Sequence, residues 1–237
     1  MKKILLIFTV LICIQSNAQN KWFETYTDST LLKRDADKII QQFASKVEKL
    51  SPNVRLKDNK AIKNTTPNLI FINNNVTVNL PFWAELIPPQ KDFFTEMGGG
   101  ISEGKEVFGL FFNGFYLVHE LGHSFLANAG KEYYNAYDGE YDANVVGILY
   151  WKAAGEKRNL KKCYVYAKKI LKILKNPVPE NEDYKKYVTE HYLELAVDPY
   201  KYGYIQFTQF VEIYEDKSLP NFDTFVKNCN MTQKSNR

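Results

Sequence analysis

The sequence has no apolar stretch long enough to cross a membrane, no internal repeat and no large excess of one charge. Its most apolar run covers residues 4–14, whereas a membrane-spanning helix needs about 20 such residues. The chain has 31 basic and 27 acidic residues, a formal net charge of +4, and the basic residues are spread along its length. We therefore expect no stable membrane span and no nucleic acid as the main partner.

Cysteine and histidine are both scarce, with three of each in 237 residues. One cysteine, Cys13, lies in the N-terminal apolar run, which leaves Cys163 and Cys229 for the folded chain. Outside the cytoplasm these two thiols can pair, but two buried free thiols fit the sequence equally well. The scarce histidines are more informative, because two of the three lie only four residues apart.

The N-terminus has the order of a secretory signal peptide. A pair of lysines precedes the apolar run, and small residues follow it up to Ala18. The bulky Ile12 directly before Cys13 argues against lipid modification of that cysteine. We expect residues 1–18 to be removed on export, which leaves residues 19–237 as one domain in the periplasm or the extracellular medium.

The part of the chain before residue 113 has a mixed character. Apolar residues at helical intervals from Leu31 to Leu50 predict a first helix, which Asp28 or Ser29 could cap. Residues 68–80 are rich in β-branched side chains and predict one or two strands. Residues 51–66 are expected to be rich in turns, and residues 81–90 contain too much proline for regular structure. Residues 97–106 are expected to form a mobile loop.

From Asn113 onward the pattern is almost entirely helical. Glycine and proline breaks separate the predicted helices, which are 113–128, 140–155, 160–174, 181–196, 204–216 and 221–229. A strand-containing first half followed by a helical second half is an α+β arrangement. We expect a small N-terminal lobe that contains the sheet, followed by a mostly helical C-terminal half.

The histidine pair lies in the stretch FYLVHELGHSF, residues 115–125. Four residues of an α-helix turn through about 400°, so His119 and His123 lie on one face, where both imidazoles can reach the same ion. Glu120 lies about 100° further round, where it can act on a metal-bound water without binding the metal. This HExxH pattern predicts two zinc ligands and a glutamate general base.

Gly122 is an unusual residue for the middle of this predicted helix. It costs about 1 kcal/mol relative to alanine in a helix interior. We therefore expect another part of the chain to pack closely against the backbone at Gly122.

A catalytic zinc usually has three protein ligands and one open position, so a third ligand is expected downstream. The next predicted helix begins EYDANVVGILYW at Glu140, and the short connection lets it fold back on the motif helix. Glu140 is the favoured third ligand, while Asp138 and Asp142 remain alternatives. Asn144 lies one turn after Glu140 and can hold a ligand histidine by its second ring nitrogen.

HELGH followed by a Glu-x-x-Ala-Asn helix resembles the gluzincin branch of the zincin metallopeptidases. The resemblance is close over about residues 113–151 and implies a zincin-like fold. It implies these roles: His119, His123 and Glu140 as zinc ligands, Glu120 as general base, and Asn144 as the partner of a ligand. The family usually has aspartate at the position of Asn144, and the short ligand spacing makes a compact gluzincin the better comparison.

Members of that family often use a downstream histidine or tyrosine to stabilise the oxyanion of the tetrahedral intermediate. The candidates are His191, in TEHYLEL, and the tyrosines Tyr202 and Tyr204, in DPYKYGYIQF. A lone histidine on an amphipathic helix is more often a packed or surface residue, and tyrosines also serve plain packing. With Glu120 as the base, the predicted catalytic set is completed by His191 and Tyr204.

The sequence thus predicts a secreted zinc metallopeptidase that hydrolyses peptide bonds with a zinc-activated water and Glu120 as general base. The expected cofactor is Zn²⁺ and the expected partner is a peptide or protein substrate, which a strand of residues 68–80 could pair with. Two alternatives stay open. One is a zinc hydrolase that does not cleave peptides, and the other is a binding or surface-assembly module on a zincin scaffold.

Overall fold

The computed structural model describes residues 24–235, with side chains as far as Cys229, so the predicted signal peptide lies outside the described residues. The helices and strands follow one another in this order: α1 (Ser29–Leu50), β1 (Lys60–Lys63), β2 (Phe71–Asn73), β3 (Thr77–Leu80), the short 3₁₀ helix η1 (Trp83–Glu85), α2 (Pro88–Gly98), α3 (Ile101–Phe108), the π-helical segment η2 (Gly109–Phe115), α4 (Tyr116–Asn128), α5 (Ala136–Ala153), α6 (Lys157–Ile170), α7 (Tyr184–Glu190), α8 (Tyr192–Ala196), α9 (Pro199–Glu215) and α10 (Phe222–Ser235).

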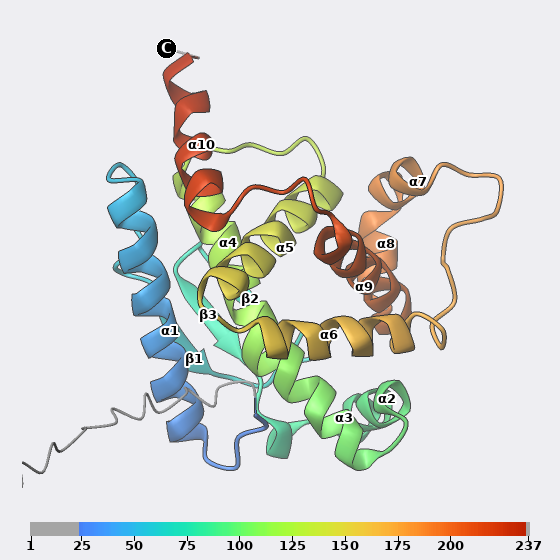
Figure 1. Ribbon diagram of the computed structural model, residues 1–237. Coiled ribbons are helices and arrows are strands. Elements are labelled where there is room, and N and C mark those ends of the chain that lie inside the picture. The colour runs from blue at the N-terminus through green and yellow to red at the C-terminus, as the bar shows by residue number, and fades with distance from the viewer. Residues whose placement is uncertain (1–23, 236–237) are drawn as a thin grey trace, which may run out of the picture.

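The predicted α+β class is confirmed, since the strands form one small sheet before residue 81 and helices dominate after it. The sheet has the order β1-β3-β2, with β1 parallel and β2 antiparallel to the central β3. Figure 1 shows α1 beside this sheet, and Phe43 of α1 also contacts Tyr150 of α5 and Phe222 of α10, so α1 packs directly on the helical half as well. Strand β1 was missed by the sequence analysis because only Ala61 of its four residues is buried.

The expected mobile loop at 97–106 is wrong, because this segment contains the end of α2 and most of α3. Its glycines serve close packing: a Cβ on Gly98 would lie 2.3 Å from the backbone nitrogen of Gly104. Gly99 ends α2 with a φ of +85°, a left-handed conformation that favours glycine. The proline-rich segment before it is also partly helical, since Pro88 and Pro89 occupy the first turn of α2, where proline is tolerated.

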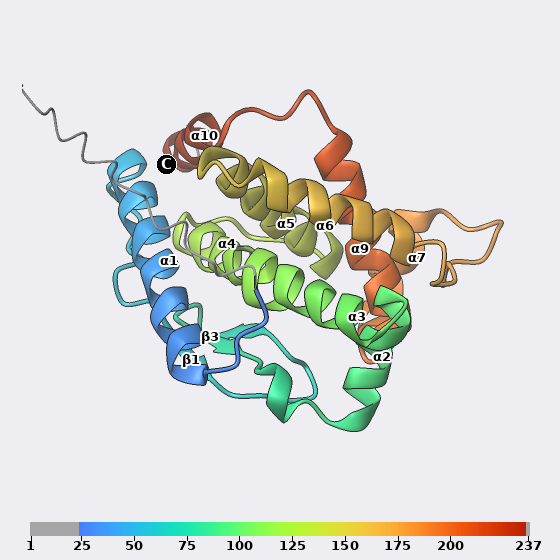
Figure 2. The same cartoon turned by 60° about the horizontal axis from the view of Figure 1, so that its bottom comes forward.

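The motif helix is longer than predicted. Residues 101–128 run on through α3, η2 and α4, and Figure 2 shows them as one green rod through the molecule. The π-helical segment, with its wider i→i+5 turns, lies directly before the histidine motif, a position where such segments often accompany functional sites.

Three other predicted helices begin earlier than expected, and one of them is α6, which begins at Lys157 rather than at residue 160. Helix α5 begins at Ala136, where the side chain of Asn135 accepts the backbone N–H of Asp138. Helix α9 begins at Pro199 rather than at residue 204, with proline in its first turn and the Asp198 side chain as its cap. The predicted helix 181–196 is divided at His191 into α7 and α8.

Two hydrophobic clusters support these elements. The large one joins α1, the sheet, the rod of residues 101–128, α5, α6, the second half of α9 and α10. The small one is built from five buried residues of α5, α7, α8, α9 and the loop before α7: Tyr137, Val178, Val188, Leu195 and Ile205.

The structure also bears on the state of the cysteines and on the prediction that the chain has no membrane span. Cys163 is buried and Cys229 half-buried, and both are free thiols. No helix of the described part of the chain has the length and apolar character to cross a membrane.

Candidate metal centre

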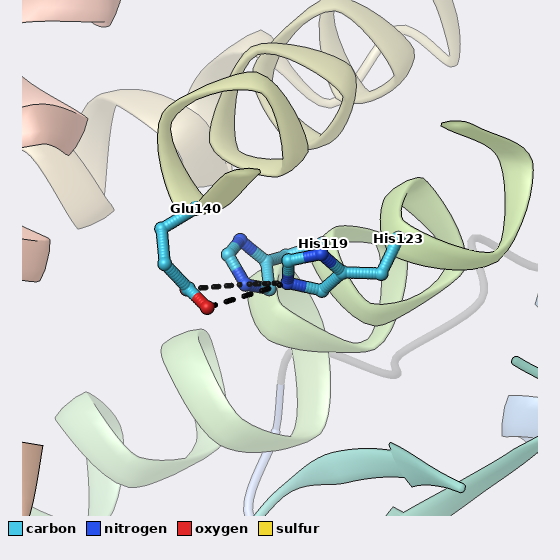
Figure 3. Close-up of side chains that lie close together, drawn as sticks. All are labelled: His119, His123 and Glu140. Atoms are coloured by element: carbon cyan, nitrogen blue, oxygen red, sulfur yellow. Dashed lines mark hydrogen bonds and ion pairs between the residues drawn. The ribbon is translucent and has the colours of Figure 1, made fainter. Parts of the chain in front are cut away.

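Helices α4 and α5 bring three potential metal-binding side chains together. Figure 3 shows His119 and His123 of α4 facing Glu140 of α5. The two Nε2 atoms of the histidines are 3.2 Å apart. Glu140 Oε2 lies 3.2 Å from His119 Nε2, and its Oε1 lies 3.6 Å from His123 Nε2. The predicted arrangement of these three residues around a common point is therefore present in the fold.

The donor set fits zinc in type and in spacing. Imidazole nitrogens and a carboxylate oxygen are ordinary zinc ligands. Two ligand atoms about 2.1 Å from a tetrahedral zinc lie about 3.4 Å from each other, and the three observed separations bracket this value. Three ligands also match a catalytic site better than a structural one, which usually has four protein ligands.

The close approach of α4 and α5 explains why Glu140 reaches the histidines. A Cβ on Gly122 would lie 3.1 Å from the side chain of Val146 and 3.2 Å from the backbone oxygen of Ala143. This confirms the close packing expected at Gly122. Any larger residue there would push α5, and Glu140 with it, away from α4.

A buried hydrogen-bond network fixes the orientation of His119. Its Nδ1 donates to Asn144 Oδ1 at 2.9 Å, which agrees with the prediction that Asn144 holds one histidine of the motif. The Asn144 amide in turn donates to the side-chain oxygens of Gln206 and Gln209 of α9, at 3.1 and 3.0 Å. Because the two glutamines accept from Asn144, its oxygen must face His119, and the proton of His119 stays on Nδ1 while Nε2 faces Glu140.

The same helix α9 holds Glu140. Gln206 Nε2 donates to Glu140 Oε2 at 2.8 Å, and the Tyr202 hydroxyl donates to the same oxygen at 3.2 Å. The Tyr192 hydroxyl, at the start of α8, lies 3.5 Å from that of Tyr202 and faces the same carboxylate. Gln206 thus contacts both Glu140 and Asn144, the hydrogen-bond partner of His119.

The charges of the three ligands are strongly coupled. Burial disfavours the charged form of Glu140, but the hydrogen bond and charge of His119 outweigh it and hold the pKa of Glu140 at about 2. Burial likewise lowers the pKa of His119, yet Glu140 more than compensates and raises it. Burial and the neighbouring His119 lower the pKa of His123 to about 4. A bound cation would replace the proton that His119 and Glu140 share.

Glu120 lies beside this group and is buried between α4 and the edge strand β2. Burial is the main reason why the pKa of Glu120 rises to about 7. The positive charge of His119 lowers this pKa, and the negative charge of Glu140 raises it further. The backbone N–H of Ile72 in β2 donates to the carboxylate. A carboxyl group that titrates near neutral pH is suited to accept and return a proton.

The alternative ligands lie on the outer side of α5. Asp142 pairs with Lys131 and accepts a hydrogen bond from the Tyr133 hydroxyl. Asp138 lies near the start of the helix, 2.7 Å from Lys185 Nζ. Each is two residues from Glu140 and so about 200° round the helix, which is why neither carboxylate is brought to the histidines.

In the described part of the chain, neither of the two predicted oxyanion-stabilising residues, His191 and Tyr204, forms a hydrogen bond or ion pair with Glu140. His191 is half-buried at the α7–α8 junction, with Nδ1 3.8 Å from Glu194 Oε2 and its ring against Tyr187. Tyr204 packs against the large hydrophobic cluster. Because α9 begins at Pro199, Tyr202 and Gln206 share the face towards Glu140, and Tyr204 is about 200° away from Tyr202.

Sequence reasoning missed Tyr192, Gln206 and Gln209 in the surroundings of the site. A signal was present for the glutamines, since they are polar positions in the apolar stretch 205–213 and share a helix face at a spacing of three. Both are fully or almost fully buried. Buried amides need partners, and this pair finds them in Asn144 and Glu140.

Comparison with models of protein families, with curated proteins and with solved structures finds no match for this chain.

Proposed function

We propose that this chain is a zinc-dependent hydrolase of peptide bonds with a compact gluzincin-like site. The spacing of the donor groups supports the proposal. The two histidine Nε2 atoms are 3.2 Å apart, and the Glu140 carboxylate lies 3.2 Å from His119 Nε2 through Oε2 and 3.6 Å from His123 Nε2 through Oε1, close to the separation of ligands on one tetrahedral zinc. His119, His123 and Glu140 would hold the ion. When bound, zinc would polarise the scissile carbonyl and lower the pKa of water at the open position.

Glu120 is the proposed general base. Its carboxylate is not one of the three clustered donors, so it stays available for proton transfer. A pKa of about 7 lets Glu120 take the proton of the attacking water and pass it to the leaving amine at neutral pH. The Ile72 N–H fixes the carboxylate beside β2, and thus beside the expected path of the substrate.

Strand β2 is the proposed guide for the substrate. It lies at the edge of the sheet and pairs only with β3 in the three-stranded order β1-β3-β2. An extended peptide can add to such an edge through main-chain hydrogen bonds. Because Ile72 of β2 also contacts Glu120, a peptide on this edge would pass the base.

The variant Glu120→Gln tests this function. It keeps the side-chain shape but cannot accept a proton, so hydrolysis should fall roughly 10²–10⁴-fold while zinc content stays the same. Wild type, Glu120→Gln and chelated wild type are compared on an unstructured protein and a peptide library. Equal cleavage by wild type and Glu120→Gln would exclude Glu120 as the base. Failure of zinc-loaded wild type to cleave any peptide would favour a non-peptidase hydrolase or a binding module.

We also propose that the protein is exported, on the basis of the N-terminal sequence alone. Mass spectrometry of the exported chain should give an N-terminus at Gln19. An intact Met1 or an acylated Cys13 would contradict this.

A further inference from the structure

Helix α6 and the turn after it concentrate positive charge. Residues 157–175 contain no acidic side chain and eight basic ones: Lys157, Arg158, Lys161, Lys162, Lys168, Lys169, Lys172 and Lys175. Without these eight, the chain has 23 basic residues against 27 acidic ones, a net charge of −4. The even spread of basic residues assumed from the sequence is therefore wrong for this segment, which is basic within an otherwise acidic molecule.

The basic side chains form an outer surface on a firmly held helix. All eight are exposed. The opposite face of α6 is anchored in the large hydrophobic cluster by Leu160, Cys163, Ala167 and Ile170, each fully buried. Figure 2 shows α6, in gold, running along the outside of the helical half. We call this exposed face of residues 157–175 the α6 basic face.

Most of this charge is not neutralised within the protein. Lys162 pairs with Glu106 at 2.7 Å, and Lys168 lies 3.4 Å from Glu215. Lys169 donates to the backbone oxygen of Gly98. No carboxylate of residues 24–229 forms an ion pair with the remaining five basic side chains, which are Lys157, Arg158, Lys161, Lys172 and Lys175.

Exposed aliphatic side chains lie among these charges. Val165 is 54% exposed and Ile173 is 40% exposed. Val165 also lines a shallow hollow of about 450 Å³, together with Glu106, Arg158, Lys161, Lys162 and Tyr166. The α6 basic face therefore combines unpaired cations with small apolar contacts, the combination that favours the headgroup boundary of a lipid bilayer.

We propose that the α6 basic face binds the surface of an anionic phospholipid bilayer. The helix has 14 residues and is about 21 Å long, so its cations form an extended row that suits a flat surface of many phosphates. Nucleic acid fits less well, because the aromatic side chains of α6 are already engaged. Tyr164 stacks on Tyr214 at 4.5 Å and the Tyr166 hydroxyl donates to Glu106, which leaves no free ring for base stacking.

A sedimentation assay with lipid vesicles tests this inference, which does not depend on the proposed hydrolase activity. The protein is mixed with vesicles of phosphatidylcholine alone or with added phosphatidylglycerol. The patch variant is Lys157→Gln/Arg158→Gln/Lys161→Gln. The matched control, Lys57→Gln/Lys186→Gln/Lys227→Gln, removes the same charge at exposed positions elsewhere. All proteins are produced in the same form, so residues 1–18 contribute equally to each.

We expect binding to the anionic vesicles only, released by salt, and weakened about fivefold for each charge removed by the patch variant. The control variant should bind almost as wild type does. Equal weakening by both variants would overturn the proposal in favour of a general charge effect. Tighter binding to a single-stranded oligonucleotide, or release by inorganic phosphate beyond that of chloride at equal ionic strength, would overturn it in favour of another anion.

Discussion

The residues around the candidate site come from two regions of the molecule, and these regions are supported by hydrophobic clusters of different size. One side is the frame, α4 and α5, which supplies His119, His123 and Glu140. Ten of the 13 residues of α4 are buried, and the frame is part of the large hydrophobic cluster. The other side is the cap, which we define as α7, α8 and the first half of α9. The cap rests on the small cluster of five buried residues and supplies Tyr192, Tyr202 and Gln206.

The difference assigns different tasks to the two sides. Ligands on the frame are held by close helix packing and cannot move without disturbing the core. The cap has little apolar burial of its own, and Leu193 and Val197 of this region are 83% and 82% exposed. Regions with few buried apolar contacts open at a lower free-energy cost than the core. In the proposed zinc site, the frame would therefore determine whether the metal binds, and the cap would adjust how tightly it binds and how its ligands are oriented.

Removing a frame ligand should have the largest effect. His119→Ala, His123→Ala and Glu140→Ala should each abolish zinc binding, because a two-ligand site lacks the usual three protein donors. Asp142→Ala is the control on the same helix, since its carboxylate is held by Lys131 instead. Zinc content after dialysis measures the effect. Zinc loss in Asp142→Ala with retention in Glu140→Ala would show that the third ligand is wrongly assigned.

The next largest effect is expected for Glu120, the proposed general base, in the pH dependence of the free energy of unfolding. Folding raises the pKa of Glu120 from an ordinary 4.5 to about 7. The contribution of Glu120 to the free energy of unfolding is therefore fully present below pH 4.5 and is lost as the pH rises through 7. At 1.4 kcal/mol per pKa unit the loss is about 3 kcal/mol.

Urea unfolding of chelated wild type and chelated Glu120→Gln across this pH range measures the loss. Glu120→Gln should lack it, because glutamine does not ionise. The difference between the two unfolding free energies should therefore change by about 3 kcal/mol from pH 4.5 to pH 8. Parallel curves would mean that Glu120 is not held in a buried, uncharged form.

The frame was largely predictable from sequence and the cap was not. Helix periodicity alone places His119 and His123 on one face, and Glu140 and Asn144 on another. Gly122 predicted the close approach that joins the two faces, and the structure confirms it. Contacts within one helix, or between neighbouring helices joined by a short connection, can be inferred from spacing.

The cap contacts depend on where helices begin and how distant segments pack. Sequence offered Tyr202 and Tyr204 as equal candidates and Tyr204 entered the predicted catalytic set, whereas the helix start at Pro199 turns Tyr202 and Gln206 towards Glu140. These partners are 62 and 66 residues away from Glu140 in the chain. The sequence analysis missed α2 and α3 for a similar reason. The glycines at 98–100 allow tight packing and end a helix, whereas their clustering suggested a mobile loop. Spacing does not reveal such tertiary uses of glycine and proline.

Substitutions of cap residues should weaken metal binding, and the loss should be larger for a residue that makes more hydrogen bonds to the frame. Gln206→Leu removes the donor to Glu140 and one acceptor of Asn144. Gln209→Leu, equally buried on the same helix, removes an acceptor of Asn144 and a donor to the Tyr137 carbonyl, but no contact with Glu140. Loss of supporting hydrogen bonds typically costs 10–100-fold in metal affinity, so we expect about this loss for Gln206→Leu and a smaller one for Gln209→Leu. Competition with a chromogenic chelator gives both dissociation constants, and equal losses would reduce Gln206 to a packing role.

The smallest effect is expected for the hydroxyl of Tyr202. Tyr202→Phe removes one donor to Glu140 Oε2, but Gln206 still donates to that oxygen at a shorter distance, 2.8 Å against 3.2 Å. The remaining donor should limit the loss in zinc affinity to about tenfold, at the lower end for a hydrogen bond to a charged group. Tyr204→Phe is the matched control, two residues along the same helix, and its packing against the core should leave zinc affinity unchanged. Chelator competition and the thermal midpoint are measured for both variants, so that a general loss of stability is separated from a loss at the site. If Tyr204→Phe were the more sensitive variant, the cap would face the frame through the other side of α9, and the position of Gln206 beside Glu140 would be wrong as well.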